Sequence, residues 1–224
     1  MNKKHIVTID GPAASGKSSV SRDLAAALGW EWLSTGAFYR GLAFVAKATK
    51  TSLYDESSLA QLATSSLWKI QTGKEKTHVF FEGADVSESI YKEDVGDIAS
   101  KISHYPAVRK ALLAAQRSFG ETQGKGLVAE GRDCGTVIFP QANIKVYLTA
   151  RSDHRAQRRA KELGGSAEEV LKAQKIRDSQ DTSRAAAPLQ VPENAEVIDT
   201  SELKQQQVVD KILQMVKVTI PLDS

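Results

Sequence analysis

Cysteine is the scarcest residue type in this 224-residue sequence, which contains only Cys134. One cysteine excludes a disulfide within the chain and any zinc site built from several cysteines. No apolar run approaches the ~20 residues that a membrane-spanning helix needs. Residues 1–5, Met-Asn-Lys-Lys-His, lead directly into the first predicted strand without an apolar signal segment. We therefore expect a cytoplasmic protein that makes no membrane contact.

An excess of charge of either sign is also missing. The 30 basic residues nearly balance the 27 acidic ones, and a net charge of +3 is too small to indicate a nucleic-acid surface. The local exception is segment 151–161, which is strongly basic. Such a run is typical of a solvated helix face, but it also suits a flap that grips an anion. Internal repeats are absent, and the length fits a single α/β domain over residues 1–224.

Residues 6–19 predict a buried strand that runs directly into a phosphate-binding loop. Gly11, Gly16, Lys17 and Ser18 match the pattern G-x-x-x-x-G-K-[ST], with β-branched residues before it and a helical pattern after it. The loop's backbone N–H groups and the helix N-terminus attract phosphate oxygens. Lys17 adds a charge for the β/γ-phosphates, and the Ser18 hydroxyl a ligand for Mg²⁺. A plain glycine turn fits this context less well, so we predict binding of a nucleoside triphosphate.

The remaining pattern alternates strands and helices, with one interruption. Apolar segments at 67–72 and 77–82 flank a four-residue loop containing glycine, which predicts an antiparallel hairpin in an inserted lobe. Ser166 and Glu169 have the spacing of a helix capping box. Besides the first strand and the hairpin, we expect strands at 30–33, 126–130, 144–149 and 195–199. We expect helices at 18–28 and 35–46, a polar helical stretch from there to about 66, and helices at 95–103, 106–120, 152–163, after 166 and at 204–217.

Four further clusters combine arginine or acidic residues with loop positions after predicted strands, where ligands collect in doubly wound sheets. Arginine grips phosphate with two hydrogen bonds, and these clusters hold more anion-binding groups than one triphosphate requires. A second phosphorylated ligand explains them most simply. The clusters are residues 35–40, Arg109 with Ser100, residues 130–133 and residues 177–184.

Each cluster also has a plainer interpretation. Arg109 taken alone is compatible with a solvated helix surface, and segment 177–184 with an ordinary charged helix. Asp133 could simply pair with Arg132. Glu130 ends an apolar strand, where it could order magnesium-bound water or serve as a plain strand-end carboxylate. Cys134 is expected to be a small loop or core residue, and the four histidines have no metal-binding spacing.

Four motifs together resemble bacterial cytidylate kinases, and they span almost the whole chain in the right order. They are Ile9-Asp-Gly-Pro-Ala-Ala-Ser-Gly-Lys17, Thr35-Gly-Ala-Phe-Tyr-Arg40, Glu130-Gly-Arg-Asp-Cys-Gly-Thr136 and Arg177-Asp-x-x-Asp181-x-x-Arg184-x-x-x-Pro188-Leu189. The resemblance implies reversible transfer of the γ-phosphoryl group of ATP to CMP or dCMP, with Mg²⁺. It also implies a three-layer P-loop kinase fold around a parallel sheet. In this fold a short helical lid covers about 151–166, and a nucleoside monophosphate (NMP)-binding insert covers about 37–103.

The same resemblance assigns site residues. Donor phosphates would be held by Gly11, Pro12, Ala13, Ala14, Ser15, Gly16, Lys17, Ser18 and Ser19. Arg40, Arg132 and Arg184 would grip the acceptor phosphate and the transferring group, and Thr35 would lie at the acceptor site. Ser100, Arg109 and Asp133 would bind the cytosine, and Arg177 and Asp181 the ribose. Lys17 and the three phosphate-gripping arginines are the expected catalytic residues.

Some positions depart from the family pattern, and two rival functions remain to be compared. Ser34 lies where aspartate is common, and Gln180 and Thr182 replace basic residues of some members. Another small-molecule kinase of this fold would lack the base-binding set, and a GTP switch or nucleic-acid ATPase would show an N-K-x-D motif or a basic aromatic stripe. Because Asp133 can accept from the cytosine amino group, we expect UMP to be a poorer substrate by at least about tenfold. We also expect a monomer.

Overall fold

The computed structural model describes residues 4–73, 75–122, 124–184 and 186–221. Its centre is a five-stranded parallel sheet in the order β2-β6-β1-β7-β8. The phosphate-binding loop follows β1, which pairs with β6 on one side and β7 on the other, so the loop lies at the switch point of the sheet. The strands are β1 (His5–Asp10), β2 (Glu31–Ser34), β6 (Gly126–Gly131), β7 (Ile144–Thr149) and β8 (Glu196–Asp199).

Helices cover both faces of this sheet, because the fully buried strand β6 carries apolar side chains on both sides. Val128 packs with side chains of α1 (Lys17–Leu28) and α9 (Gln205–Thr219), whereas Leu127 and Ala129 pack with those of α2 (Gly36–Ala48) and α6 (Pro106–Glu121). Successive side chains of a strand point to opposite faces, which explains the alternation. The resulting helix–sheet–helix layers confirm the predicted three-layer α/β fold.

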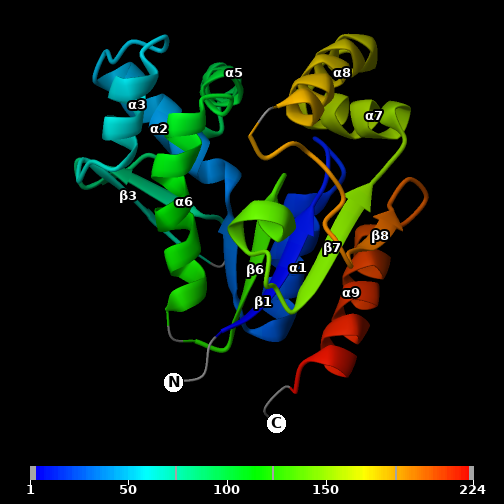
Figure 1. Cartoon of the computed structure of the whole chain (residues 1–224). Coiled ribbons are helices and arrows are strands. Elements are labelled where there is room, and N and C mark those ends of the chain that lie inside the picture. The colour runs from blue at the N-terminus through cyan, green and yellow to red at the C-terminus, as the bar shows by residue number, and fades with distance from the viewer. Residues whose placement is uncertain (1–3, 74, 123, 185, 222–224) are drawn as a thin grey trace.

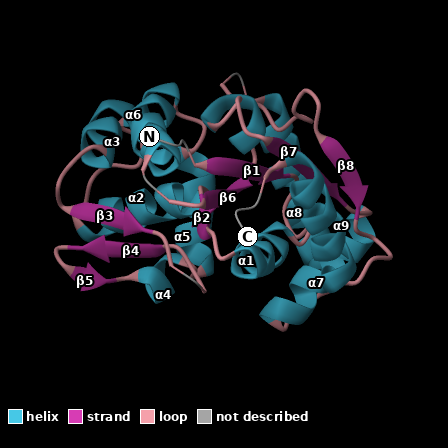
Figure 2. Ribbon diagram, turned by 90° about the horizontal axis from the view of Figure 1, so that it is seen from below, coloured by secondary structure: helices cyan, strands magenta, loops and turns pink. Residues whose placement is uncertain are grey.

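A second sheet lies to one side of the first (Figure 2). It is antiparallel and consists of β3 (Trp68–Gln71), β4 (His78–Phe81) and β5 (Ala84–Asp85), with Trp68 opposite Phe81. The predicted hairpin is confirmed, but β5 extends it by a strand that the sequence analysis missed. The helices on this side include α3 (Glu56–Ala63), α4 (Ser87–Ile90) and α5 (Glu93–Ile102).

The opposite side carries α7 (Ser152–Leu163) and α8 (Ala167–Ser183), which pack against each other. Figure 1 shows these two helices and α5 on either side of the carboxyl ends of the parallel strands. Ser166 precedes α8 directly, but its side chain makes no capping hydrogen bond, so the predicted capping box is wrong. None of the helices that the structure describes has both the length and the apolar character that a membrane crossing demands.

The hairpin of the second sheet touches the outer edge of β2. The Ser34 N–H donates a hydrogen bond of 2.8 Å to Thr77 Oγ1, and Thr72 Oγ1 donates one of 3.1 Å to Glu31 Oε2. The neighbouring Thr35 N–H donates to Glu130 O on β6, so Ser34 N points away from β6. Side chains of the hairpin thus satisfy a backbone donor that the edge of β2 would otherwise expose.

Candidate active site

The loop after β1 depends on backbone shapes that favour glycine. Gly11 has φ +146°, and a β-carbon there would lie 2.1 Å from the carbonyl oxygen of Leu148 on β7. Gly16, directly before α1, has φ +89°. Both conformations cost an L side chain strain that glycine avoids. The loop can therefore turn its N–H groups inward and lead into the positive end of α1.

Lys17 is buried beneath this loop. Its Nζ donates a hydrogen bond of 2.6 Å to the carbonyl oxygen of Pro12. Burial, together with the charge of the neighbouring Arg132, lowers the pKa of Lys17 to about 7. An anion beside Nζ would favour the charged ammonium, so the side chain is suited to a phosphate rather than to another cation.

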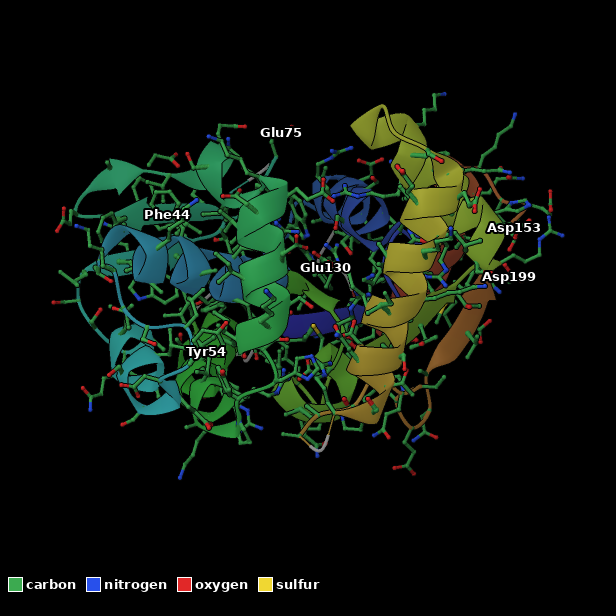
Figure 3. The ribbon with its side chains drawn as sticks, turned by 90° about the horizontal axis from the view of Figure 1, so that it is seen from above. Phe44, Tyr54, Glu75, Glu130, Asp153 and Asp199 are labelled. Atoms are coloured by element: carbon green, nitrogen blue, oxygen red, sulfur yellow. The ribbon has the colours of Figure 1, made fainter. Side chains whose placement is uncertain are left out.

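Three oxygen-bearing side chains meet at the start of α1. Ser18 Oγ donates a 3.2 Å hydrogen bond to Glu130 Oε1, and Ser34 Oγ donates to the same oxygen. Glu130 lies near the middle of the molecule, between α5 and α8 (Figure 3). Mg²⁺ takes oxygen ligands and is commonly held by one or two carboxylates together with substrate phosphates. The Ser18 hydroxyl and the Glu130 carboxylate fit that ion, although the described residues contain no cluster of three acidic, histidine or cysteine ligands.

A cavity of about 470 Å³ opens over this loop. Six of the predicted donor-binding residues line it: Ala13, Ala14, Gly16, Lys17, Ser18 and Ser19. Gly11, Pro12 and Ser15 do not, and Ser15 is buried below the loop, where its carbonyl oxygen accepts from Thr200 Oγ1. All three are buried, so they belong to the packed part of the loop rather than to the wall of the cavity.

A second cavity of about 160 Å³ lies beside the first. Every residue predicted to bind the acceptor lines it: Thr35, Arg40, Ser100, Arg109, Arg132, Asp133, Arg177, Asp181 and Arg184. These residues come from the start of α2, α5, α6, the segment after β6 and α8. Folding therefore brings together groups that are up to about 150 positions apart in the sequence.

Arg109 and Asp133 form a buried ion pair in this second cavity. Arg109 Nη1 also donates to Ser103 O at 3.1 Å, and the guanidinium carbon lies 5.4 Å from the centre of the Tyr39 ring. Burial raises the pKa of Asp133, and the charge of Arg109 opposes that shift. The plainer interpretations, Arg109 as a surface residue and Asp133 as the partner of Arg132, are therefore wrong.

Two further arginines of this cavity, Arg132 and Arg184, share the carboxylate of Asp181. Arg132 Nε lies 2.8 Å from Asp181 Oδ2, and Arg184 Nη1 lies 3.6 Å from Oδ1. Arg184 Nε and Nη2 are buried and have no hydrogen-bond partner among the described residues. Arg177 of α8, which lines the cavity, pairs with Asp97 of α5. A concentration of guanidinium groups with donors left over is suited to an anion with several oxygens.

The two cavities share part of their lining. Arg40, Arg132 and Arg177 line both, together with Gly36 and Gly131. Arg132 also donates from Nη1 to the carbonyl oxygen of Gly11 at 2.7 Å, which ties it to the phosphate-binding loop. A group that moves from one cavity to the other would pass between these side chains.

Asp10 is a structurally important residue to which the sequence analysis gave no role of its own. Its carboxylate accepts from the N–H of Cys134 at 2.8 Å and of Gly135 at 2.7 Å. These amides open a π-helix, η1 (Cys134–Ile138), directly after Asp133. Burial raises the pKa of Asp10 to about 6. An acidic residue at the end of an otherwise apolar strand was the signal available in the sequence.

The basic segment 151–161 is partly used for internal contacts. Arg155 is buried, donates to Ala13 O at 3.0 Å and pairs with Asp178 at 2.7 Å. Arg158 donates to Thr200 Oγ1 at 3.1 Å, and Arg159 lines the first cavity. A uniformly solvated helix face is therefore wrong for α7, because at least Arg155 faces the loop and α8.

A phosphate-binding loop at the switch point of a parallel sheet, with an arginine-lined cavity next to it, defines a phosphotransferase of the P-loop class. A gluconokinase from Sinorhizobium meliloti has a similar fold, with a TM-score of 0.52 over 98% of this chain and 95% of that one. At 12% sequence identity this likeness concerns the fold alone.

The particular family follows from sequence comparisons. The family model for cytidylate kinase matches residues 7–218. A cytidylate kinase of Bdellovibrio bacteriovorus is 58% identical over 212 residues, which cover 95% of this chain and 97% of that protein. A cytidylate kinase of Aeromonas salmonicida is 42% identical over 213 residues, with coverage of 93% and 92%. The chain belongs to the cytidylate kinase family.

Proposed function

We propose that the protein transfers the γ-phosphoryl group of ATP to CMP and dCMP across the junction of the two cavities. The observation that carries this proposal is their shared lining by Arg40, Arg132 and Arg177, with the phosphate-binding loop on one side. Membership of the cytidylate kinase family supports the choice of substrates. The acceptor nucleotide would bind in the cavity around Asp133.

On the donor side, residues 11–19 hold the ATP phosphates through backbone N–H groups and the Lys17 ammonium. Ser18 and Glu130 would hold Mg²⁺, together with phosphate oxygens and water. The ion supplies positive charge that neutralises the phosphates. Lys17 leaves its hydrogen bond to Pro12 and turns to the phosphate, where the anion restores its charge.

On the acceptor side, the proposed roles require existing ion pairs to be exchanged. Arg132 and Arg184 are held by Asp181 and would turn toward the acceptor phosphate. Asp181 is then available for a ribose hydroxyl, as is Arg177 once it leaves Asp97. The pair of Arg109 and Asp133 can bind cytosine without separating, because a carboxylate accepts more than one hydrogen bond. Ser100 and Thr35 complete the wall of the cavity.

Cytosine and uracil would be distinguished by the carboxylate of Asp133. The amino group of cytosine can donate to it, whereas uracil presents a carbonyl oxygen at the same position, so two acceptors would face each other. A buried polar group without a partner costs about 1–3 kcal/mol. This mismatch predicts the preference for CMP over UMP.

The reaction needs no general base. The second pKa of a phosphate monoester is about 6, so the acceptor oxygen is already ionised near neutral pH. The protein's residues then act by holding the two substrates in line and by placing arginines around the migrating group. We propose that the insert at about 37–103 and the lid at about 151–166 close over the substrates and exclude water, which would otherwise hydrolyse ATP.

We also propose that the enzyme works as a cytoplasmic monomer in pyrimidine nucleotide metabolism. The single cysteine suits a reducing compartment. Large exposed apolar side chains of the described residues, such as Tyr54, Ile176 and Val218, lie on different helices or loops, as on many monomers. Light scattering at assay concentration should give the mass of one chain, and the mass of a dimer would contradict this part of the proposal.

The deciding experiment is ADP formation from ATP and Mg²⁺ with CMP, dCMP, UMP, AMP or no acceptor, each tested separately. Rapid turnover restricted to the two cytidylates is expected. Rapid turnover with AMP, or equal turnover without an acceptor, would leave the phosphate-binding loop in place but overturn the proposed acceptor site.

A further inference from the structure

Arg40 differs from the other arginines of the acceptor cavity in how its charge is held. Arg109, Arg132, Arg177 and Arg184 each have a carboxylate partner. For Arg40, no carboxylate of the described residues lies within ion-pair distance. Arg40 lines both cavities and is one of the residues predicted to grip phosphate. Among these residues it is the one that comes from the proposed insert.

Uncharged groups at the corner between α4 and α5 hold its guanidinium instead. Arg40 Nη1 donates a 3.1 Å hydrogen bond to the carbonyl oxygen of Ile90, which ends α4. The guanidinium carbon lies 5.7 Å from the centre of the Tyr91 ring, within range of a cation–π contact. We call this group, Ile90, Tyr91 and Gly96, the Arg40 cradle.

Gly96, in the first half of α5, leaves the space that the guanidinium fills. A β-carbon at this position would lie 2.9 Å from Arg40 Nη1 and 3.0 Å from Nη2. The obstructing atoms are the far end of a flexible side chain, so an added methyl group would displace the guanidinium rather than the backbone. Glycine normally weakens the interior of a helix, which makes this contact a physical reason for its presence.

The cradle orients Arg40 without neutralising it. A carboxylate partner must be released before an arginine can bind phosphate, whereas a carbonyl oxygen and an aromatic face leave the full positive charge available. Burial lowers the pKa of the Arg40 guanidinium, which shows that its charge is partly shielded from water. A charge that is partly shielded from water attracts a phosphoryl group more strongly than a fully solvated charge does.

We infer that Tyr91 and Gly96 are positioning residues that hold Arg40 ready for the migrating phosphoryl group. This inference rests on the proposed function, in which Arg40 contacts that group. Tyr91 also lines the donor cavity and is 43% exposed, so its ring forms part of the wall of the reaction site. The phenol hydroxyl is not required for the inferred role, because the ring face makes the contact.

The first test compares three substitutions of tyrosine by steady-state kinetics with ATP and CMP. Tyr91→Leu should lower kcat about tenfold, in proportion to the loss of a partly desolvated cation–π contact, and kcat/KM should fall equally. Tyr91→Phe should keep kcat within about twofold because the ring remains. Tyr54→Leu is the matched control, since Tyr54 lies in the same insert and is 92% exposed. An unchanged kcat in Tyr91→Leu would overturn the inference.

Gly96→Ala separates catalysis from stability. Alanine favours a helix interior over glycine, so the melting temperature should stay the same or rise, while kcat should fall about tenfold as the guanidinium is displaced. A kcat equal to that of the unmodified protein would overturn the role of Gly96. The unchanged or raised melting temperature excludes unfolding as the cause of a lower rate.

A double-mutant cycle with Arg40→Lys shows whether Tyr91 acts through Arg40. Tyr91→Leu should lower kcat less than about twofold in the Arg40→Lys background, because the planar guanidinium is already gone. A full tenfold loss there would overturn the inference while leaving the proposed function intact. If Arg40→Lys alone kept full activity, the role of Arg40 in the proposed function would itself be wrong.

Discussion

The phosphate-binding loop and the acceptor cavity are suited to anions in different ways. The loop is a continuous stretch whose shape comes from its backbone, with glycine at φ +146° and +89° at its two ends. The acceptor cavity is built from side chains of several distant elements. The donor site is therefore largely formed before its ligand arrives, whereas the acceptor site must exchange partners.

The two sites therefore differ in when the free-energy cost of forming them arises. The loop takes up its binding shape when the protein folds, so the arrival of ATP requires only Lys17 to change its hydrogen-bond partner. In the acceptor cavity, Arg132 and Arg177 each leave a carboxylate before they reach the nucleotide. Exchange of ion pairs keeps buried charges compensated in the free protein, and it allows a phosphate to compete with the protein's own carboxylates.

The largest effect is expected from a substitution that removes the mobile charge of the donor loop. Lys17→Met should lower kcat roughly 10²–10³-fold, comparable to the loss of a key electrostatic donor in other enzymes. Binding of CMP alone, measured by calorimetry, should persist because Lys17 does not line the acceptor cavity. Lys125→Met, at an exposed position, serves as the control. Loss of CMP binding in Lys17→Met would contradict the separation of the two sites.

The next prediction concerns Asp10, which connects the strand of the donor loop to the segment of Asp133. Its folded-state pKa of about 6 exceeds the ordinary value of 3.8. The folded protein therefore binds more protons than the unfolded chain between these pH values, and ionisation of Asp10 opposes folding. The contribution of Asp10 to the free energy of unfolding is fully present below pH 3.8 and is lost as the pH rises through 6. The total loss is about 3 kcal/mol.

Urea unfolding at several pH values between 4 and 7 tests this prediction. The free energy of unfolding of Asp10→Asn should decline less with rising pH than that of the unmodified protein, because an amide does not titrate in this range. The comparison uses the slopes, since the amide also replaces one of the two hydrogen-bond acceptors for the η1 amides. Identical slopes in the two proteins would contradict the assignment.

A smaller effect is expected in base selection. An amide at position 133 can either donate or accept, so Asp133→Asn should lower the preference for CMP over UMP, expressed as kcat/KM, by at least about tenfold. Both substrates are measured with the same enzyme preparation, so any loss of folded protein cancels. A preference that does not change would remove Asp133 from the base-binding set.

The smallest effect concerns the half-exposed pair of Asp97 and Arg177, of which Arg177 lines the acceptor cavity. Asp97→Asn frees Arg177 from its partner, and exposed ion pairs are worth about 0.2–1 kcal/mol. The KM for CMP should therefore fall by a factor between about 1.4 and 5. Asp94→Asn on the same helix is the control, because its partner Lys47 does not line the cavity. A rise in KM would mean that Asp97 itself helps to bind the nucleotide.

The two sites also differ in how far the sequence could predict them. The donor loop has a local pattern, and the strand before it and the helix after it are both present. The nine acceptor residues came from the family resemblance, and the structure places all of them on one cavity. Their roles remain proposals, as do the proposed limits of the insert and the lid.

Pairing within the site could not be predicted because it depends on distances between remote segments. The partner of Asp133 is Arg109 of α6 rather than its sequence neighbour Arg132. The short elements β5 and α4 were missed because two and four residues are too few to show a period. The contact between Gly96 and Arg40 joins residues 56 positions apart, so it follows only from the packing of α5 against α2.

The hydrogen bond from Ser34 N to Thr77 has a consequence for the behaviour of many copies in solution. An open strand edge is a template on which another chain can add a strand, and β2 is an edge strand of the parallel sheet. The hairpin of the antiparallel sheet covers this edge with the side chains of Thr72 and Thr77. The inserted antiparallel sheet therefore also protects the parallel sheet against edge-to-edge association with another copy.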